Sequence, residues 1–328
     1  MKNTKVMSGK LVCAALFALT VLTGSSALAQ DGPYPTKAVK FITASVGSPQ
    51  DVIGRLIGQR LSVLWGKPVV VENRPGAGSL LSITTAARAA PDGYSILLSS
   101  SGFTVSPSIM STPGYDAEKD FIPVVLIAST PNIIVAGTQL PASDLRAAVE
   151  LAKARSLNYG SPGLGTTPQL SAEYLFKSLA KVPVTHVPYN GASPAVAAVA
   201  GGQVEMASVA MPAAVQLVKA GKVRALAVTS NRRTKVLPDV PTIAEAGFTG
   251  FEDSTWVGLW VQKGTPAAIT EKIAGDVVAI LAQADVKEQL VNLGFEASDL
   301  PPKQFAAYQK QELAKWARVV KEVGIKPE

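Results

Sequence analysis

The sequence predicts an α/β protein of two lobes, each a mostly parallel sheet flanked by helices. Short apolar runs alternate with segments of helical periodicity along most of the 328 residues, the pattern of parallel strands joined by crossover helices. Hydrophobic residues make up 47% of the chain and aromatic residues only 6%, as is typical of helices packed on buried strands. Because the chain exceeds the usual size of one hydrophobic core, we expect two lobes.

The first 29 residues read as a signal peptide. Three lysines among the first ten residues precede an apolar run at 11–23, which is too short to span a membrane, and Ala27-Leu28-Ala29 is a small-residue cleavage site. We therefore expect a periplasmic protein whose mature chain begins near Gln30. Losing three lysines lowers the formal net charge from +7 to +4. This mild excess, without a basic stripe, argues against a nucleic-acid partner.

The first lobe should begin with a strand at residues 39–44. It leads into a loop, 45–50, and a helix with apolar residues at helical spacing. We interpret Asp51, near the start of this helix, as a capping carboxylate rather than a catalytic group. The loop is a candidate ligand site, because open α/β sheets bind ligands at the carboxyl ends of their strands.

A second strand is predicted at 68–72, and Ser79 is expected to cap a helix that runs to about residue 90. The next strand, 94–98, ends at the hydroxyl-rich loop 99–102. Two interpretations of Ser100 and Ser101 remain open: they face the same cleft, or they belong to a plain polar turn.

The most informative stretch runs from Asn158 to Pro168, where an apolar run leads into a turn with three glycines and then a helix. Thr167 is predicted to be the N-cap and Pro168 the first helical residue. The N–H groups of such a helix start and the positive end of its dipole form an anion site. Thr166 stands where a phosphate-binding P-loop has its lysine, so we expect a carboxylate rather than a nucleotide. A plain strand-to-helix turn is the alternative.

The lobe boundaries are predicted as 30–127 plus 253–328 for the first lobe and 128–252 for the second. Near-continuous apolar residues at 121–128 and 133–136 suggest buried strands that cross between the lobes. The other predicted elements are a helix at 143–155, strands at 184–188, 203–209, 223–228 and 255–261, helix starts at Ser193-Pro194, Pro212, Thr265-Pro266 and Asp285 with Glu288, and a final amphipathic helix at 301–323 whose aromatic residues pack inward.

Catalytic chemistry has little support. The one histidine, His186, lies in an apolar strand, and no Gly-x-Ser-x-Gly elbow occurs. The one cysteine, Cys13, lies in the leader, so a histidine or cysteine metal site has no second ligand. We interpret His186 as structural and expect no enzyme activity, no metal and no cofactor. Carboxylates acting alone, as in glycosidases, remain an alternative.

Several segments resemble the Bug family, the TctC-like periplasmic solute receptors of tripartite tricarboxylate transporters. The agreement runs in order from about Tyr34 to the C-terminus. The segments that carry it are 69–78 (VVVENRPGAG), 91–94 (PDGY), 186–191 (HVPYNG) with Pro194, 224–229 (RALAVT), 237–242 (LPDVPT), 245–247 (EAG) and Trp256.

The resemblance implies a type II-like Venus-flytrap fold that closes on a small carboxylate and delivers it to membrane permease subunits. It also implies that the loop at 45–50 and the loop at 161–167 grip carboxylates, largely through backbone N–H groups. We expect a monomer. The candidate ligand-binding residues are Ser45, Val46, Gly47, Ser48, Gln50, Ser100, Ser101, Ser161, Gly163, Gly165, Thr166, Thr167 and Tyr189.

The loop at 45–50 departs from the family pattern, which is of the type PFPPGGTD where this chain reads ASVGSPQD. Pro49 replaces a glycine and removes a backbone donor, while Ser45, Ser48 and Gln50 add side-chain donors. Gln169 and Asn190 replace the family's common histidine and its lysine or arginine. We expect the ligand to be a dicarboxylate or an aromatic carboxylate. We hypothesise that the end of the ligand that contacts the first lobe is bulkier or less charged than the end of a simple aliphatic dicarboxylate. A structure with succinate or citrate gripped directly at both loops would contradict this.

Three other functions are open to the same two-lobe architecture. A ligand sensor for a signalling partner would need no change in the binding residues. An exported hydrolase would release its ligand chemically altered. The effector domain of a regulator would need a DNA-binding helix-turn-helix before the first lobe, where this sequence has a signal peptide instead.

Overall fold

The computed structural model describes residues 33–76, 79–298 and 300–325. Contacts divide the chain into two units, Met1–Thr36 and Lys37–Glu328, and every helix and strand described here belongs to the second. The predicted signal peptide, 1–29, and its cleavage site lie outside the described residues. In the described part of the chain, no helix is long and apolar enough to cross a membrane.

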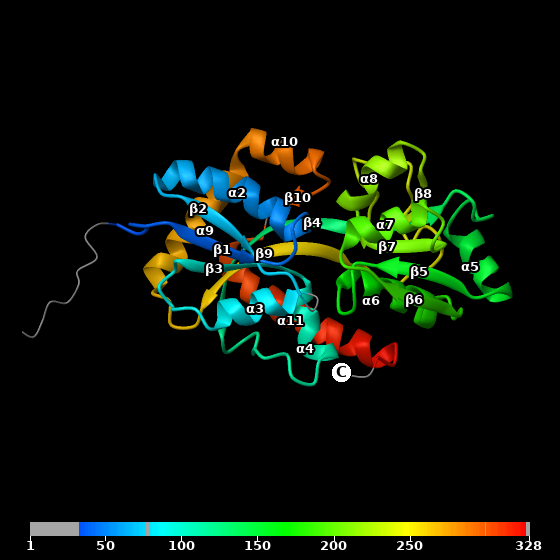
Figure 1. Ribbon diagram of the computed structural model, residues 1–328, viewed down its shortest axis with the longest axis horizontal. Coiled ribbons are helices and arrows are strands. Elements are labelled where there is room, and N and C mark those ends of the chain that lie inside the picture. Colours follow the sequence, from blue (N-terminus) through cyan, green and yellow to red (C-terminus); the bar gives the residue numbers. More distant parts are fainter. Residues whose placement is uncertain (1–32, 77–78, 299, 326–328) are drawn as a thin grey trace, which may run out of the picture. The chain divides into compact units, whose positions relative to one another are not determined.

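Strands and helices alternate along the chain (Figure 1). The strands are β1 Val39–Thr43, β2 Val69–Asn73, β3 Ser95–Ser100, β4 Phe121–Gly137, β5 Leu157–Ser161, β6 Val184–Pro188, β7 Met206–Ala210, β8 Val223–Val228, β9 Ser254–Gln262 and β10 Glu296–Ala297. The helices are α2 Pro49–Trp65, α3 Leu80–Ala87, α4 Gly102–Ile109, α5 Leu145–Ala154, α6 Thr167–Glu173 with its π-helical extension η2 Tyr174–Leu179, α7 Ala192–Ala200, α8 Pro212–Lys219, α9 Ala267–Ala282, α10 Ala284–Asn292 and α11 Pro302–Glu322.

The strands form one mixed sheet in the order β2-β1-β3-β9-β4-β7-β5-β6, with β8 and β10 also paired to β4. Its outer parts are parallel, as predicted: β1 pairs with β2 and β3, and β5 with β6 and β7. The central strands β4 and β9 are antiparallel to their neighbours, because β9 carries the chain back along β4 in the opposite direction. The α/β class is therefore confirmed, with an antiparallel centre that the predicted parallel sheets did not include.

Strand β4 changes partners partway along its length. It pairs with β9 as far as Pro131 and with β7 from Asn132 onward. Register shifts near Pro123 and Leu126 accommodate this long strand. The two apolar runs that were predicted as separate strands are thus one strand that joins both halves of the sheet.

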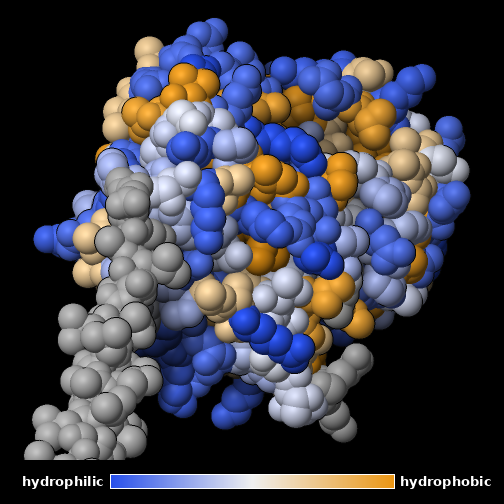
Figure 2. Space-filling view, turned by 60° about the vertical axis from the view of Figure 1, so that its left-hand side comes forward, coloured by the Kyte–Doolittle hydropathy of each residue, from blue (hydrophilic) through white to orange (hydrophobic). Residues whose placement is uncertain are grey.

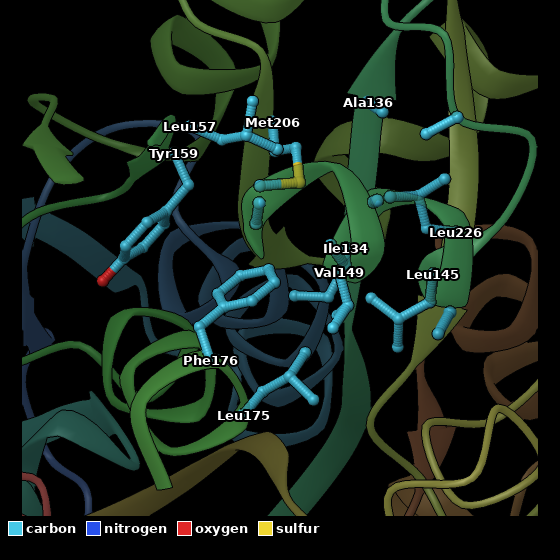
Figure 3. Packing of buried hydrophobic residues seen from close by; sticks show 14 of the residues in the cluster. Ile134, Ala136, Leu145, Val149, Leu157, Tyr159, Leu175, Phe176, Met206 and Leu226 are labelled. Atoms are coloured by element: carbon cyan, nitrogen blue, oxygen red, sulfur yellow. The ribbon is translucent and has the colours of Figure 1, made fainter. Parts of the chain in front are cut away.

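Apolar side chains pack between the strands and the helices in both halves of the sheet. Figure 3 shows Tyr159 of β5 and Phe176 of η2 packed with Ile134 of β4 and residues of α5. In the other half, Trp256 and Trp260 of β9 pack on Phe305 of α11. The final helix was correctly predicted to pack its aromatic residues inward. On the face drawn in Figure 2, apolar residues are interspersed with hydrophilic ones, as is usual for a protein surface.

Several predicted helix starts are wrong in detail. Ser79 precedes α3 with φ +88° and makes no side-chain cap, and the helix ends at Ala87 rather than near residue 90. Helix α7 begins at Ala192 with Gly191 as N-cap, so Ser193 lies inside its first turn. The predicted pair of Asp285 and Glu288 does not cap α10, because the Asp285 carboxylate instead pairs with Arg60.

Candidate functional site

A cavity of about 610 Å³ lies at the carboxyl ends of the parallel strands, within the usual range for small-molecule sites. None of the described residues that line it has an ionisable side chain. Hydroxyls, carboxamides, prolines, glycines and a few apolar groups form its wall. The lining residues are Ala44, Ser45, Val46, Gly47, Ser48, Pro49, Gln50, Pro75, Gly76, Ser79, Ser100, Gly102, Pro162, Thr166, Thr167, Pro168, Asn190, Gly191, Ala192, Ser193, Pro194, Ala210 and Thr255.

Five helices begin at this cavity. The starts of α2, α3, α4, α6 and α7 contribute the lining residues Ser48, Ser79, Gly102, Thr166 and Ala192, respectively. The N–H groups of a first helical turn have no carbonyl partner within their own helix, and each helix start carries a partial positive charge. These helix starts therefore favour an anion in the cavity, although no lysine or arginine lines it in the described part of the chain.

The loop before α2 is held by an internal carboxylate. Asp51 is 2% exposed, and its Oδ2 accepts from the Gly47 N–H at 2.9 Å. Arg55 donates to both oxygens, at 3.2 and 2.9 Å, and Asn73 Nδ2 donates to Oδ1 at 2.9 Å. Burial tends to raise the pKa of Asp51, but the hydrogen bonds from Arg55, Gly47 and Asn73 outweigh it and lower the pKa. Asp51 is therefore a structural anion, in keeping with the capping role predicted for it.

The loop before α6 is held by side chains beneath it. Ser161 Oγ shares a hydrogen bond with His186 Nε2 at 2.7 Å and accepts from the Gly163 N–H at 3.2 Å. Gly165 N–H donates to Gln169 Oε1 at 3.3 Å. The N-cap is Thr166 rather than Thr167, and neither hydroxyl caps the helix, because Thr166 donates to the Gly163 carbonyl instead. Several loop N–H groups are thus used to hold the loop's own shape.

His186 of β6 belongs to a partly buried polar group. Its ring lies 5.0 Å from the ring of Tyr159, whose hydroxyl donates to Glu173, and Glu173 pairs with Lys177. Burial lowers the pKa of His186, against the opposing effect of Glu173. Burial, with the charge of Glu173, raises the pKa of Tyr159. Ser161 is fully buried and does not line the cavity, so its contact with His186 has the geometry of a positioning contact.

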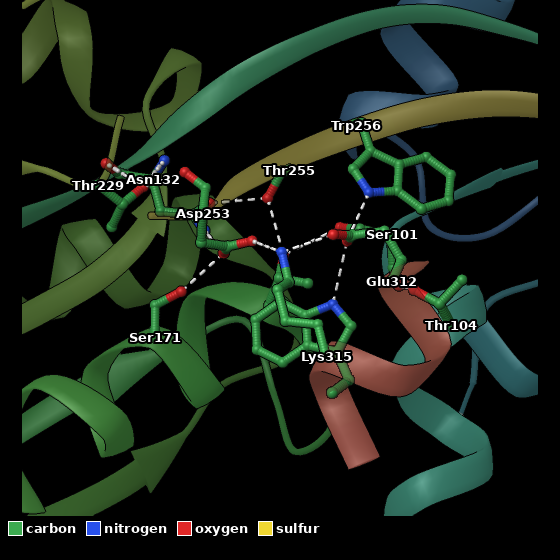
Figure 4. Close-up of polar contacts among 12 residues, drawn as sticks. Ser101, Thr104, Asn132, Ser171, Thr229, Asp253, Thr255, Trp256, Glu312 and Lys315 are labelled. Atoms are coloured by element: carbon green, nitrogen blue, oxygen red, sulfur yellow. Dashed lines mark hydrogen bonds and ion pairs between the residues drawn. The ribbon is translucent and has the colours of Figure 1, made fainter. Parts of the chain in front are cut away.

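A chain of hydroxyls leads from the cavity into the sheet. Thr167 Oγ1 lies 3.0 Å from Ser101 Oγ and 3.1 Å from Thr255 Oγ1. Thr255 donates to Asn132 Oδ1 at 2.7 Å, at the point where β4 changes partners. Asn132 in turn donates to Asp253 Oδ2 at 2.7 Å. Figure 4 shows this network between β4, β9 and α11.

Asp253 is the buried end of this network. It accepts from Ser171 at 2.7 Å and lies 3.4 Å from Lys315 Nζ, which also pairs with Glu312 at 2.6 Å. Burial raises the pKa of Asp253 to about 6, although Lys315 works against this. The pKa of Lys315 is raised because the two carboxylates outweigh its desolvation. The network ties α6, β4, β9 and α11 together at one place.

Eight of the candidate ligand-binding residues line the cavity and five do not. The eight are Ser45, Val46, Gly47, Ser48, Gln50, Ser100, Thr166 and Thr167. Four of the five make contacts that hold the loop before α6 instead. Ser101 bonds to Thr167, Gly163 donates to Ser161, and Gly165 donates to Gln169. Tyr189 packs its ring against Gly160, where an added Cβ would lie 3.0 Å from Tyr189 Cε2, and its N–H donates to the Ser161 carbonyl.

The sequence interpretation missed part of the wall. Gly76 and Ser79 follow β2, and the residues from Asn190 to Pro194 follow β6. A usable signal existed, because the carboxyl ends of parallel strands meet at one edge of a sheet. Thr255 offered no comparable signal, since it lies at the start of β9. Among the described residues, no group of three or more histidine, cysteine, aspartate or glutamate side chains could hold a metal ion.

Comparison with known proteins places the chain in a family. The family model described as "Tripartite tricarboxylate transporter family receptor" (TctC) matches residues 53–325. Protein BugT of Bordetella pertussis is 31% identical over 325 residues, which cover 98% of this chain and 99% of BugT. The similarity to BugT thus extends along nearly the whole chain.

Two solved structures share this fold closely. R. palustris Rpa4515 with adipate has a TM-score of 0.86 and 33% sequence identity, covering 90% of this chain and 100% of that one. MatC (Rpa3494) from Rhodopseudomonas palustris with bound malate has a TM-score of 0.81 and 33% identity, covering 88% and 100%. The predicted resemblance is confirmed: this chain belongs to the TctC family of tripartite tricarboxylate transporter receptors, which includes the Bug proteins.

Proposed function

We propose that the cavity captures a small carboxylate, which the protein delivers to the permease subunits of a tripartite tricarboxylate transporter. The observation that carries this proposal is the convergence of five helix starts on a cavity lined by no ionisable side chain among the described residues. Such a site stabilises a negative charge by N–H groups and dipoles. The relatives with adipate and malate support the same ligand class.

The receptor acts by closure of two lobes, 30–127 plus 253–328 and 128–252. The partner change of β4 at Pro131 and Asn132 supports this division, because β9 runs alongside β4 at the same place. Residues from both proposed lobes line the cavity, so a ligand that contacts both would favour the closed form. Closure then presents the lobes to the permease.

The protein works in the periplasm as a monomer, after removal of the signal peptide near Ala29, and releases its ligand chemically unchanged. The family of receptors supports a non-enzymatic role. Ser161 and His186 could suggest a hydrolase, but Ser161 is fully buried away from the cavity wall. Recovery of the bound ligand with its mass unaltered would separate the receptor from the hydrolase.

A charge placed at the cavity rim tests the ligand's charge. Ser193 is exposed, lines the cavity and lies in the first turn of α7, where an aspartate stabilises a helix. Ser193→Asp should therefore fold at least as well as the wild type yet bind a carboxylate about tenfold more weakly at low salt. Calorimetric titration would measure this loss, which high salt should reduce.

Ser193→Asn is the matched control, since it has the same shape without the charge. It should bind the carboxylate nearly as well as the wild type. Equal affinities in the aspartate and asparagine variants, at every salt concentration, would contradict the proposal that an anion occupies this cavity.

A further inference from the structure

The two ends of the cavity differ in what they offer a ligand. The α6 and α7 end presents helix starts at Thr166 and Ala192. The α2 end contains the loop from Ser45 to Gln50, with the carboxylate of Asp51 directly beneath it. A ligand that spans the cavity therefore meets the starts of α6 and α7 at one end, and at the other a loop with an internal carboxylate behind it.

Two backbone donors of the loop before α2 are already used within the loop. The Gly47 N–H donates to Asp51 Oδ2 at 2.9 Å, and the Ser48 N–H donates to the Ser45 carbonyl at 3.2 Å. Pro49 has no N–H. The one cation of this group, Arg55, is bound to both Asp51 oxygens and does not line the cavity. The charge beneath the loop is thus locally balanced without any ligand.

Gln50 gives this end a different chemistry. Gln50 lines the cavity although it is only 3% exposed, and its carboxamide makes one weak contact among the described residues, from Nε2 to Ser79 Oγ at 3.4 Å. Three serines, Ser45, Ser48 and Ser79, line the same cavity. Carboxamides and hydroxyls both donate and accept hydrogen bonds, whereas a carboxylate only accepts.

A buried charge that lacks a cation or enough donors pays a large desolvation penalty, while a neutral polar group needs only one or two hydrogen bonds. The α2 end offers the second environment. We propose that the ligand is a monocarboxylate whose far end carries a neutral hydrogen-bonding group, such as an amide or a hydroxyl, and that Gln50 is the residue that selects it. This inference rests on the proposed function, because the α6 and α7 end must hold the single carboxylate.

Matched ligand pairs test the inference directly. Calorimetric titration would compare dicarboxylates of four to eight carbons, and terephthalate, with the monoamide of each at pH 7.5. Each pair differs only in the charge at one end. We expect the best monoamide to bind at least tenfold more tightly than its diacid.

Two substitutions assign the preference to residues. Gln50→Leu keeps a similar volume and should reduce the monoamide preference to less than threefold. Pro49→Ala restores a backbone N–H at the start of α2 and should improve diacid binding at least threefold. Pro212→Ala is the control, because Pro212 occupies the equivalent position of α8 and does not line the cavity. It should leave both affinities unchanged.

The outcomes separate the two levels of the proposal. A diacid that binds as tightly as its monoamide, or more tightly, overturns this inference and leaves the carboxylate receptor standing. If no diacid and no monoamide binds at millimolar concentration, the proposed function fails and the inference fails with it. A monoamide preference that survives in Gln50→Leu overturns the role of Gln50.

Discussion

Ser161 shows how single side chains shape this site without touching a ligand. Its hydroxyl joins His186 Nε2 at 2.7 Å to the Gly163 N–H at 3.2 Å, so it links β6 to the loop before α6. His186 is the one histidine of the sequence, so a histidine-based catalytic site would have to use it. Its lowered pKa and its partly buried position agree instead with the structural role predicted for it.

Ser161→Ala should lower the free energy of unfolding by about 1 kcal/mol, because it removes the hydrogen bond to a partly buried imidazole nitrogen. It should also weaken carboxylate binding, since the loop at 161–167 loses an anchor. Denaturant unfolding and calorimetry would measure the two effects.

Ser156→Ala is the control for this substitution. Ser156 is exposed, and its hydroxyl lies 3.5 Å from that of Thr185 at the other end of the same strand pair. The change there should be within about 0.5 kcal/mol. Equal destabilisation by both substitutions would show that the contact with His186 does not position the loop.

For single residues, the sequence predicted which hydroxyl and N–H groups lie near the cavity better than it predicted their hydrogen-bond partners. Thr167 was expected to cap α6, but its hydroxyl bonds to Ser101 and Thr255, which are distant in sequence. Gly47 was expected to offer its N–H to a ligand, but Asp51 accepts it. Local patterns indicate where a hydroxyl or an N–H stands, whereas tertiary contacts decide what it bonds to.

Among the elements, β4 and β9 matter most, because the polar network around Asp253 joins them to α6 and α11. Asp253 accepts from Asn132 and Ser171, and the charged groups that face it are Lys315 and Glu312 of α11. The network lies where β4 changes its pairing. Its protonation state should therefore affect the stability of the protein.

Asp253→Asn should change how stability depends on pH. The pKa of about 6 in the folded protein lies above the ordinary value of 3.8, so the folded state binds more protons than the unfolded state between these values. The contribution of Asp253 is therefore complete below about pH 4 and is lost as pH rises to about 6. Wild-type stability relative to the variant should fall by about 3 kcal/mol across that window.

Urea unfolding of both proteins from pH 4 to pH 8 would measure this difference. Above about pH 7 the difference should be constant, because Asp253 is then ionised in both states. A difference that stays flat from pH 4 to pH 6, or that grows with pH, would show that Asp253 does not titrate as its burial indicates.

Most elements were predictable from periodicity and turn residues, and the exceptions have physical causes. Residues 99–102 read as the end of a strand and a polar loop, and helix α4 beginning at Gly102 was not expected. Its sequence contains β-branched residues and an internal proline, Pro107, which are poor helix formers. Packing of Val105 against Trp316, Val319 and Val320 of α11 stabilises the helix instead.

Across the whole molecule, the pattern of parallel strands predicted the location of the site, because strand ends and helix starts gather at one edge of the sheet. The α/β class and the family were also predicted correctly. The antiparallel centre and the single strand β4 were not predicted, since an apolar run carries no information about the direction of its partners. Which loop N–H groups bond within the protein, such as those of Gly47 and Gly165, can be seen only in the assembled cavity.

The central claim is that this cavity holds a carboxylate by helix starts. Thermal unfolding of the mature chain against aliphatic and aromatic mono- and dicarboxylates, their monoamides and neutral analogues tests it most directly. A carboxylate at a hundred times its Kd should add about 2.7 kcal/mol of stability, with the ligand recovered unchanged. Stabilisation by neutral analogues alone, with no response to any carboxylate, would contradict the claim.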